Sequence, residues 1–552
     1  MTKRVVSTVF ALLLGGAAAV PARQHAEEHA AAPKPPALLS GLGTHRHPIA
    51  TSSPEAQKFF DQGMVMLFGF NHDEAFRSFE RAAQLDPKAP MPRWGMALAI
   101  GANYNDPAPA ADRLKRARAE VDKALALSPA APENERAYVN ALAKRYAANP
   151  ESADAAALLH DYNAAMRELS LKYPDDLDAA TLFAESGMNL RPWKLYRPDG
   201  SPEEGTDEIV AVLESVLKRE PNHPGANHYY IHAVEASRHP ERALASATRL
   251  ETLVPSAGHL VHMPSHIYIR TGSYLEAEKS NAQAADVDRQ YIRETGASGM
   301  YPMMYYTHNV HFQSAAAAMA GRHGVAKKAA DVLFADAFPG VVHEPMLEGF
   351  LPQPLFVALR FHEWEDVRKT EDPGPKLPLY RAVWLYARAM AAAAAKDVQS
   401  AEALRLAYGI ARDAVPGTAF ASPQNSGAAM LAVATAVLDA RIAEAAGDRA
   451  AALASWEKGV AAEDALAYDE PPAWYYPVRE SHGAALLLAG RAADAERVFR
   501  ADLERHPRNP RSLLGLAESL KAQGKTADAS FARAQFETAS KDADVPLRIE
   551  DL

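Results

Sequence analysis

The chain has 552 residues, of which 48% are hydrophobic, 23% charged and 8% aromatic, so it can bury a large core. Its net charge is −10 without a dense cluster of Lys and Arg, which argues against a nucleic-acid partner because binding to phosphates depends on clustered positive charge. The absence of cysteine excludes disulfides, thiolate nucleophiles, iron–sulfur clusters and covalently attached c-type haem. Any metal must therefore be held mainly by nitrogen and oxygen.

The N-terminal segment has the pattern of a secretory signal peptide over residues 1–22. Lys3 and Arg4 precede an apolar run over residues 5–14, and small residues continue to Ala22, where cleavage is expected. The run is too short to span a bilayer, and no later stretch is apolar for long enough, so the mature chain is expected to have no membrane span. This pattern predicts a periplasmic or secreted protein; an uncleaved lipid anchor is the alternative.

Residues 23–54 are predicted to form a flexible leader, because Pro33 and Pro35 stand among polar residues. His45 and His47 lie in this leader and are expected to be exposed to solvent. The alternative is that they reach into a groove of the folded body.

A period of 34 residues organises the rest of the chain. Three pairs of identical residues stand 34 positions apart: Gly490 and Gly524, Asp494 and Asp528, and Ala495 and Ala529. A fixed period of this length predicts helical hairpins that stack on one another.

One stretch near the start of this array shows the repeat pattern most clearly. It carries Gly63, Ala75, Phe79, Ala82 and Pro87. Small residues let the two helices of a hairpin approach, Phe fills the groove between them, and Pro ends the second helix. With this spacing the chain resembles the tetratricopeptide-repeat (TPR) family.

The resemblance implies an all-α fold, a TPR helical-hairpin solenoid that runs continuously over residues 55–545 and is followed by a C-terminal tail, 546–552. Two insertions into the repeat pattern are expected to lie as loops over the concave groove. The first spans residues 190–205 and contains Trp193, and the second contains Tyr305. In the alternative interpretation these aromatic residues only pad neighbouring hairpins.

Histidine is the residue type that points most strongly to chemistry. Seven of the 20 histidines fall between residues 228 and 311: His228, His232, His259, His262, His266, His308 and His311. Counting from the repeat markers puts all seven within an arc of about 80° on three successive first helices. In TPR proteins that face lines the concave groove, so the resemblance implies a row of imidazoles across the groove.

The spacing of these histidines predicts a transition-metal site. The pairs His228/His232 and His262/His266 are four residues apart, which turns both rings of a pair to one side of a helix. Imidazole is a ligand for copper, zinc or iron. One of two carboxylates, Glu185 or Glu235, is expected to bind the metal or to orient an imidazole. Three other histidines are expected to be further ligands or substrate contacts: His259, His308 and His311.

Two further features bear on this site. Pro264 stands inside the helix predicted to carry three of the histidines, so that helix is expected to kink or to start there. The acidic and aromatic segment 468–477 is expected either to close the groove or to cap a hairpin.

Two functions remain open at this point. The first is a metal site in the groove, either in an enzyme with a small-molecule substrate or in a protein that handles metal. The second is an interaction scaffold that binds a peptide or a partner protein in the groove without metal. A haem held by two histidines is a third, weaker alternative. The chain has no H-E-x-x-H, G-x-S-x-G, phosphate-loop or dinucleotide motif, so no reaction is assigned.

Overall fold

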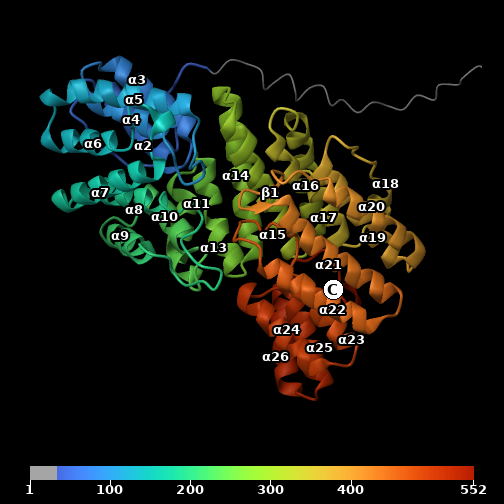
Figure 1. Cartoon of the computed structure of the whole chain (residues 1–552). Coiled ribbons are helices and arrows are strands. Elements are labelled where there is room, and N and C mark those ends of the chain that lie inside the picture. Colours follow the sequence, from blue (N-terminus) through green and yellow to red (C-terminus); the bar gives the residue numbers. More distant parts are fainter. Residues whose placement is uncertain (1–33) are drawn as a thin grey trace, which may run out of the picture.

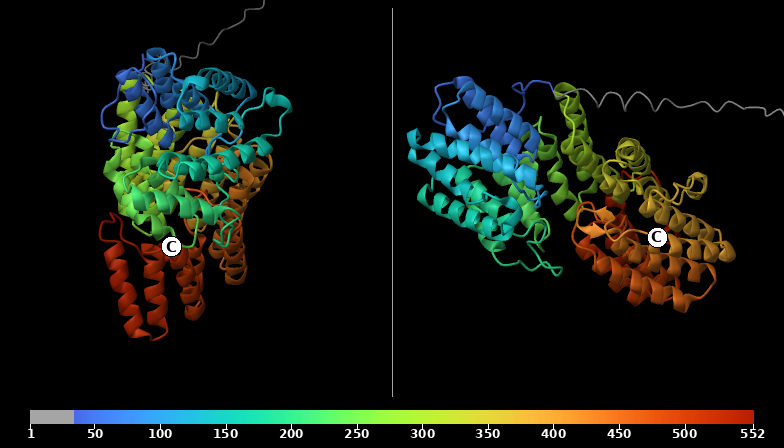
Figure 2. Two further views of the ribbon diagram at one scale, coloured as in Figure 1. Left: turned by 90° about the vertical axis from the view of Figure 1, so that its left-hand side faces the viewer. Right: turned by 45° about the horizontal axis from the view of Figure 1, so that its top comes forward.

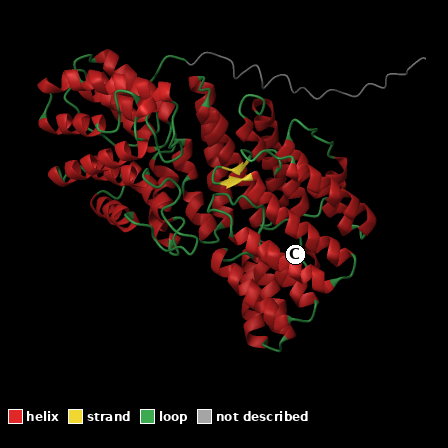
Figure 3. Cartoon of the chain, viewed as in Figure 1, coloured by secondary structure: helices red, strands yellow, loops and turns green. Residues whose placement is uncertain are grey.

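The computed structural model describes residues 34–552 (Figure 1). The predicted signal peptide, residues 1–22, and the first part of the predicted leader lie outside the described residues. The described part of the chain is a succession of helices with one small β-hairpin (Figure 3). The predicted all-α solenoid is confirmed.

The helices of the N-terminal half are α2 (Pro54–Phe68), α3 (His72–Leu85), α4 (Pro90–Ala99), α5 (Ala111–Leu127), α6 (Glu133–Ala143), α7 (Ala155–Lys172), α8 (Leu177–Met188), α9 (Thr206–Arg219), α10 (Pro224–Val234), α11 (Leu244–Leu253), α12 (Gly258–His262), α13 (Pro264–Arg270), α14 (Tyr274–Thr295), α15 (Thr307–Met319) and α16 (His323–Ala337). A short π-helix, η4, spans Tyr301–Tyr306.

The C-terminal half contains α17 (Gln353–Arg360), α18 (Trp364–Lys369), α19 (Pro378–Ala394), α20 (Val398–Asp413), α21 (Gly427–Ala445), α22 (Arg449–Asp464), α23 (Val478–Leu488), α24 (Ala492–Arg505), α25 (Pro510–Ala522) and α26 (Thr526–Ala539). Strands β1 (Phe420–Ser422) and β2 (Asn425–Ser426) pair antiparallel. No helix of the described chain is both long enough and apolar enough to cross a membrane.

Glycine and phenylalanine set the close approach of successive helices, as the repeat pattern predicts. The Phe79 ring on α3 lies between Gly63 on α2 and Gly95 on α4, and a Cβ atom added at either glycine would come within 2.5 or 2.6 Å of the ring. Phe499 lies in the same way between Gly483 and Gly515 near the other end of the array. Such distances leave no room for a methyl group, so these positions need glycine.

The array curls, so that distant repeats meet (Figure 2). The turn after α24 returns to the turn after α13, where the Arg508 guanidinium donates to the Thr271 carbonyl oxygen over 2.7 Å. The largest buried apolar cluster of the described chain runs from Ala56 to Ala320, and a second one runs from Ala337 to Val478. The histidine-bearing helices α10, α12, α13 and α15 belong to the N-terminal half.

The described part of the predicted leader lies against this body. The Leu39 amide donates to the Gln62 side chain over 2.8 Å, and the Ser256 amide donates to the Gly41 carbonyl oxygen over 3.1 Å. Residues 34–53 are therefore tied to α2 and to the loop before α12.

Candidate metal centre

Four helices of the N-terminal half bring six histidines together. Helix α10 carries His228 and His232, α12 carries His259 and His262, α13 carries His266, and α15 carries His308. Five of the six side chains are at most 3% exposed, and His308 is half-buried. Burial of this many imidazoles in one place is unusual, because each polar nitrogen needs a partner there.

Pro264 starts a new helix without turning the histidines apart. Helix α12 ends at His262 and α13 begins at Pro264, as one of the two sequence expectations had it. Met263 between them keeps right-handed helical angles, φ −52° and ψ −34°. His262 and His266 therefore stay on one side, with their Nε2 atoms 2.7 Å apart.

The six imidazoles form two groups of three, each with ligand atoms within 4.8 Å of one another. We call His228, His232 and His259 the first triad, and His262, His266 and His308 the second triad. In the first triad the Nε2 atoms of His228 and His259 are 3.2 Å apart. In the second, the Nε2 atom of His308 lies 3.2 Å from that of His262. The rings therefore aim the same nitrogen at each other.

The other ring nitrogen, Nδ1, is engaged in four of the six histidines. Its acceptors are the Phe68 carbonyl oxygen for His228 at 2.5 Å, Asn281 Oδ1 for His262 at 2.6 Å, and the two oxygens of Glu235 for His232 and His266 at 2.8 and 2.5 Å. A neutral imidazole that donates from Nδ1 keeps a free lone pair on Nε2. Acceptors on the far side of the ring hold metal-binding histidines in this way.

The charge state of the cluster also suits a metal. Burial, then the neighbouring imidazoles, hold the pKa values of His228, His259 and His262 well below the usual range. Burial alone would raise the pKa of Glu235, but the charges of His266 and His232 and their hydrogen bonds outweigh it and hold that pKa at about 2. At neutral pH the imidazoles of these three residues are unprotonated and the carboxylate is charged.

The Nε2 atoms that face each other show whether these residues suit a metal ion. The unprotonated Nε2 atoms of His228 and His259, 3.2 Å apart, repel each other unless a proton or a metal ion lies between them. In the 2.7 Å pair, burial lowers the pKa of His266, but the charge of Glu235 and its hydrogen bond outweigh it and raise that pKa, so a proton on His266 can bridge to His262. The Nε2 atom of His232 is buried and has no hydrogen-bond partner. One metal ion bound in each triad would accept the lone pairs of its three imidazoles. In the first triad it would remove the repulsion between His228 and His259 and would give His232 a partner.

Two residues expected in the site lie elsewhere. Glu185 is buried on α8, where Asn189 donates to it over 2.5 Å and Arg145 supplies the opposing charge, so it joins neither triad. His311 lies about one turn beyond His308 on a similar face of α15, where it packs on the Phe350 ring at a centroid distance of 5.4 Å, and it belongs to neither triad. Glu235 does not need to bind a metal directly to act here, since both of its oxygens already hold imidazoles.

Aromatic rings from both insertions cover the first triad. Tyr305 meets His259 edge to face at a centroid distance of 5.0 Å, and Trp193 meets His232 at 5.5 Å. Tyr104 and Phe70, which sequence reasoning did not single out, lie 5.4 and 5.8 Å from His232. The insertions therefore lie over the histidines, as expected for the binding face.

A second group of histidines holds the leader through Asp178. Asp178 accepts from His47 Nδ1 at 2.6 Å and from His223 Nε2 at 3.0 Å, and His45 Nε2 lies 3.2 Å from it. His223 Nδ1 accepts from the Ala226 amide over 3.1 Å, so its proton is on Nε2 and no lone pair is left. His45 and His47 are thus largely buried, contrary to the expectation that they are exposed.

The acidic segment expected to close the groove approaches the second triad from the C-terminal half. Tyr468 donates to Glu470 over 2.5 Å, and the Arg270 guanidinium at the end of α13 lies over the Tyr468 ring at 5.4 Å. Burial raises the pKa of Glu470 to about 7, although the charges of His266 and Arg270 oppose the shift. The Glu470 carboxylate therefore lies within electrostatic range of His266.

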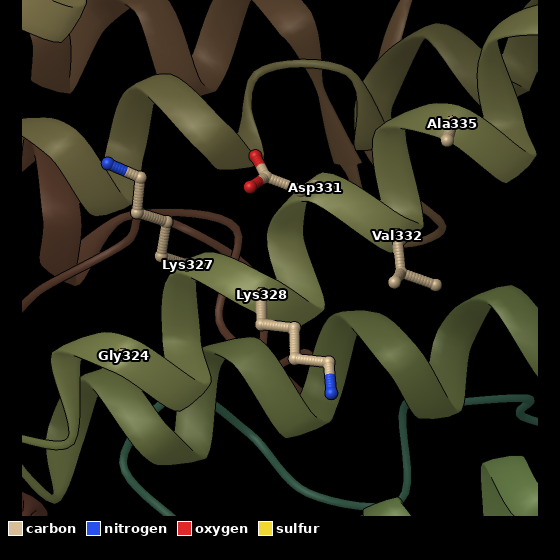
Figure 4. Close-up of a pocket in the computed structure, with 6 residues that line it drawn as sticks. All are labelled: Gly324, Lys327, Lys328, Asp331, Val332 and Ala335. Carbon is tan, nitrogen blue, oxygen red and sulfur yellow. The ribbon is translucent and has the colours of Figure 1, made fainter. Parts of the chain in front are cut away.

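Two cavities outside the histidine cluster are less suited to bind a ligand. One depression lies along α16 alone, between Gly324 and Ala335 (Figure 4), and a single helix face cannot enclose a ligand. A groove of about 360 Å³ in the C-terminal half is lined in part by residues 550–552, and Arg441 donates there to the Leu552 carbonyl oxygen over 2.7 Å. The chain's own tail contributes to that wall.

Comparison with known proteins adds no functional assignment. No protein-family model and no curated protein sequence matches the chain. The human IFIT1 dimer with m7Gppp-AAAA is 14% identical, with 90% of this chain and 92% of that chain covered and a TM-score of 0.30. Yeast Tom70 is 13% identical, with 89% and 99% covered and a TM-score of 0.29. At these scores the assignment of the fold rests on the helices themselves.

Proposed function

We propose that this TPR-like solenoid binds two transition-metal ions, one in each histidine triad, and that copper is the metal. The observation that carries the proposal is the orientation of the rings. Four imidazoles, two in each triad, donate from Nδ1 to fixed acceptors and keep Nε2 available, and the ligand nitrogens of each triad lie within 4.8 Å of one another. Without a metal, the buried His232 Nε2 has no hydrogen-bond partner.

Charge balance favours copper among the metals that imidazole binds. An imidazole that gives its lone pair to a metal is neutral, and the anion hydrogen-bonded to these ligands is Glu235. Two divalent ions would bring four positive charges into a buried site against two carboxylates, Glu235 and Glu470, whereas two monovalent copper ions bring two. Since unbalanced buried charge is costly, the monovalent ion fits better.

Three protein ligands leave each ion an open position. Sites that keep such a position are typical of metal ions that act on a bound molecule, whereas structural sites are closed by four ligands. The arrangement therefore supports a metal-dependent enzyme rather than a purely structural site. A periplasmic or secreted location, predicted from residues 1–22, belongs to this proposal.

The test compares two histidines of one helix. His308→Ala removes a ligand of the second triad, and His311→Ala removes a histidine three residues further along α15 that faces Phe350. Elemental analysis after copper loading is expected to give a lower metal content for His308→Ala and an unchanged content for His311→Ala. Equal contents in both variants and in the unmodified protein would overturn the assignment of the second triad.

An interaction scaffold is the second candidate function. The observation that favours it is an apolar face on α20, where Leu406 and Ile410 stand one turn apart and are 66% and 76% exposed. A contiguous exposed apolar surface is typical of a protein-binding site. The two functions separate on chelation, because a scaffold without metal keeps its melting temperature when a strong chelator is added, whereas a metal-loaded centre does not.

A further inference from the structure

Three side chains from three different loops meet over the first triad. Asn105 lies between α4 and α5, Trp193 lies between α8 and α9, and Tyr305 lies in the π-helix η4. Asn105 Nδ2 donates to the Tyr305 hydroxyl over 3.2 Å, and Trp193 Nε1 donates to Asn105 Oδ1 over 3.2 Å. One amide thus ties the two aromatic rings together. We call these three residues the cover.

The cover is held by few contacts compared with the triad below it. Asn105 is exposed, and Trp193 and Tyr305 are half-buried, so water competes for both hydrogen bonds. Trp193 has φ +61°, a left-handed backbone conformation that side chains rarely adopt. Residues held in this way gather at functional sites.

The backbone around Tyr305 can absorb a movement. Gly296 and Gly299 precede η4 with φ +67° and +85°, and a Cβ atom at Gly299 would meet nothing within 4 Å. Hinges are built from a few loop positions that tolerate such dihedral changes. The π-helix itself is a rare form that is frequent at functional sites.

The Tyr305 side chain marks the contacts that a phenol would make. Its ring meets the His259 imidazole edge to face at 5.0 Å and stacks on Tyr301 at 5.3 Å. Its hydroxyl accepts from the Asn105 amide. These contacts need a flat aromatic ring with one polar group, and an aliphatic ring does not reproduce them.

The polar groups of the cover favour a neutral ligand. The polar groups of the cover are an amide, an indole N–H and a phenol hydroxyl, none of which is charged. The charges that act on the Tyr305 hydroxyl come from the carboxylates of Asp106, which is paired with Arg113, and Asp73. Neither carboxylate favours a second anion beside it, so an aromatic acid is expected to bind more weakly than a phenol.

We propose that the cover opens to admit a small neutral phenol, which takes the place of the Tyr305 ring beside His259 and is bound by the Asn105 amide. The inference rests on the proposed function, since it brings the ligand next to the first triad. It assigns a substrate class to that site and a selecting role to Asn105, Trp193 and Tyr305.

The experiment measures binding of p-cresol by calorimetry, with metal-free and copper-loaded protein, beside 4-methylcyclohexanol and 4-methylbenzoate. We expect p-cresol to bind and the other two compounds to bind at least tenfold more weakly. Tyr305→Phe removes the hydroxyl that ties the closed cover to Asn105, so the phenol competes with one hydrogen bond less. Its affinity for p-cresol is expected to rise about fivefold.

Tyr306→Phe is the matched control. Tyr306 is the next residue of η4, but its hydroxyl bonds Asp336 at 2.8 Å and Arg289 at 3.2 Å. This variant is expected to bind p-cresol as the unmodified protein does. No p-cresol binding in either the unmodified protein or Tyr305→Phe would overturn the inference, and so would equal effects of the two variants or equal binding of the three compounds.

Metal content of the same samples separates the two proposals. Phenol binding with the expected pattern in metal-free protein that takes up no copper would support the cover and refute the metal centre. Copper uptake without phenol binding would support the centre and refute the cover.

Discussion

Glu235→Gln tests how the two triads are connected. Each carboxylate oxygen of Glu235 accepts an Nδ1 proton, one from His232 in the first triad and one from His266 in the second, at 2.8 and 2.5 Å. The glutamine keeps the size of the side chain but replaces one acceptor by an NH2 group. That group would face an N–H donor, so one imidazole must turn or lose its partner.

The expected loss follows from one hydrogen bond and from the negative charge that both triads share. Removal of a group that orients a ligand typically weakens metal binding by about 10- to 100-fold, which corresponds to about 1.4 to 2.8 kcal/mol. Because Glu235 holds one histidine of each triad, and because its charge serves both, we expect both ions to bind more weakly. A variant of a single ligand, such as His308→Ala, should weaken only one site.

Competition with a chromophoric copper chelator measures both affinities in one titration. Glu185→Gln is the control, because Glu185 is also a buried carboxylate of the N-terminal half but its partner is Asn189. We expect this control to leave copper affinity unchanged. Equal affinities for Glu235→Gln and the unmodified protein, or a loss confined to one site, would refute the reasoning.

The remaining predictions concern pH, packing and the leader. A strong chelator at pH 7.5 should lower the melting temperature of the copper-loaded protein. Because protons compete for the imidazoles, the difference in melting temperature between chelated and copper-loaded protein should shrink toward zero near pH 5. A difference that stays constant with pH would contradict this. The metal-free protein should itself lose stability as the pH falls below about 6.5, because His228, His259 and His262 have lowered pKa values in the folded state and the unfolded chain binds more protons; urea titrations with the same midpoint at pH 7.5 and pH 5.5 would contradict it. Gly63→Ala would place a methyl group 2.5 Å from the Phe79 ring and should cost about 1–3 kcal/mol in urea unfolding. Gly409→Ala is the control, because it is also a helical position but an added Cβ atom meets nothing within 4 Å; equal stabilities of the two variants would contradict the packing argument. Asp178→Asn removes the charge that holds His45, His47 and His223 and should make residues 34–53 more sensitive to limited proteolysis; unchanged cleavage would contradict the anchoring role.

Sequence reasoning reached the repeat fold and most of the candidate site because both are periodic. Gly63 and Phe79 identify the repeat in the first hairpin. Counting from the repeat markers Pro221 and Ala243 puts His228, His232 and His262 on one face. His266 stays with them although Pro264 starts a new helix, because Met263 keeps helical angles.

The failures have local physical causes. His311 lies one turn beyond His308, next to Phe350, and a count from repeat markers gives its face of the helix but not its distance from the other imidazoles. Glu185 stands at a matching position, yet Asn189 and Arg145 engage it. The acceptor for His228 is the backbone carbonyl of Phe68, so the residue type at that position could not predict this contact.

Elemental analysis of the purified protein after copper loading and removal of weakly bound metal tests the central claim most directly. Two histidine triads, each with converging Nε2 atoms, predict two copper ions per chain. A value of two, falling in the Glu235→Gln variant, is the expected result. A chain that retains no copper under these conditions would contradict the account.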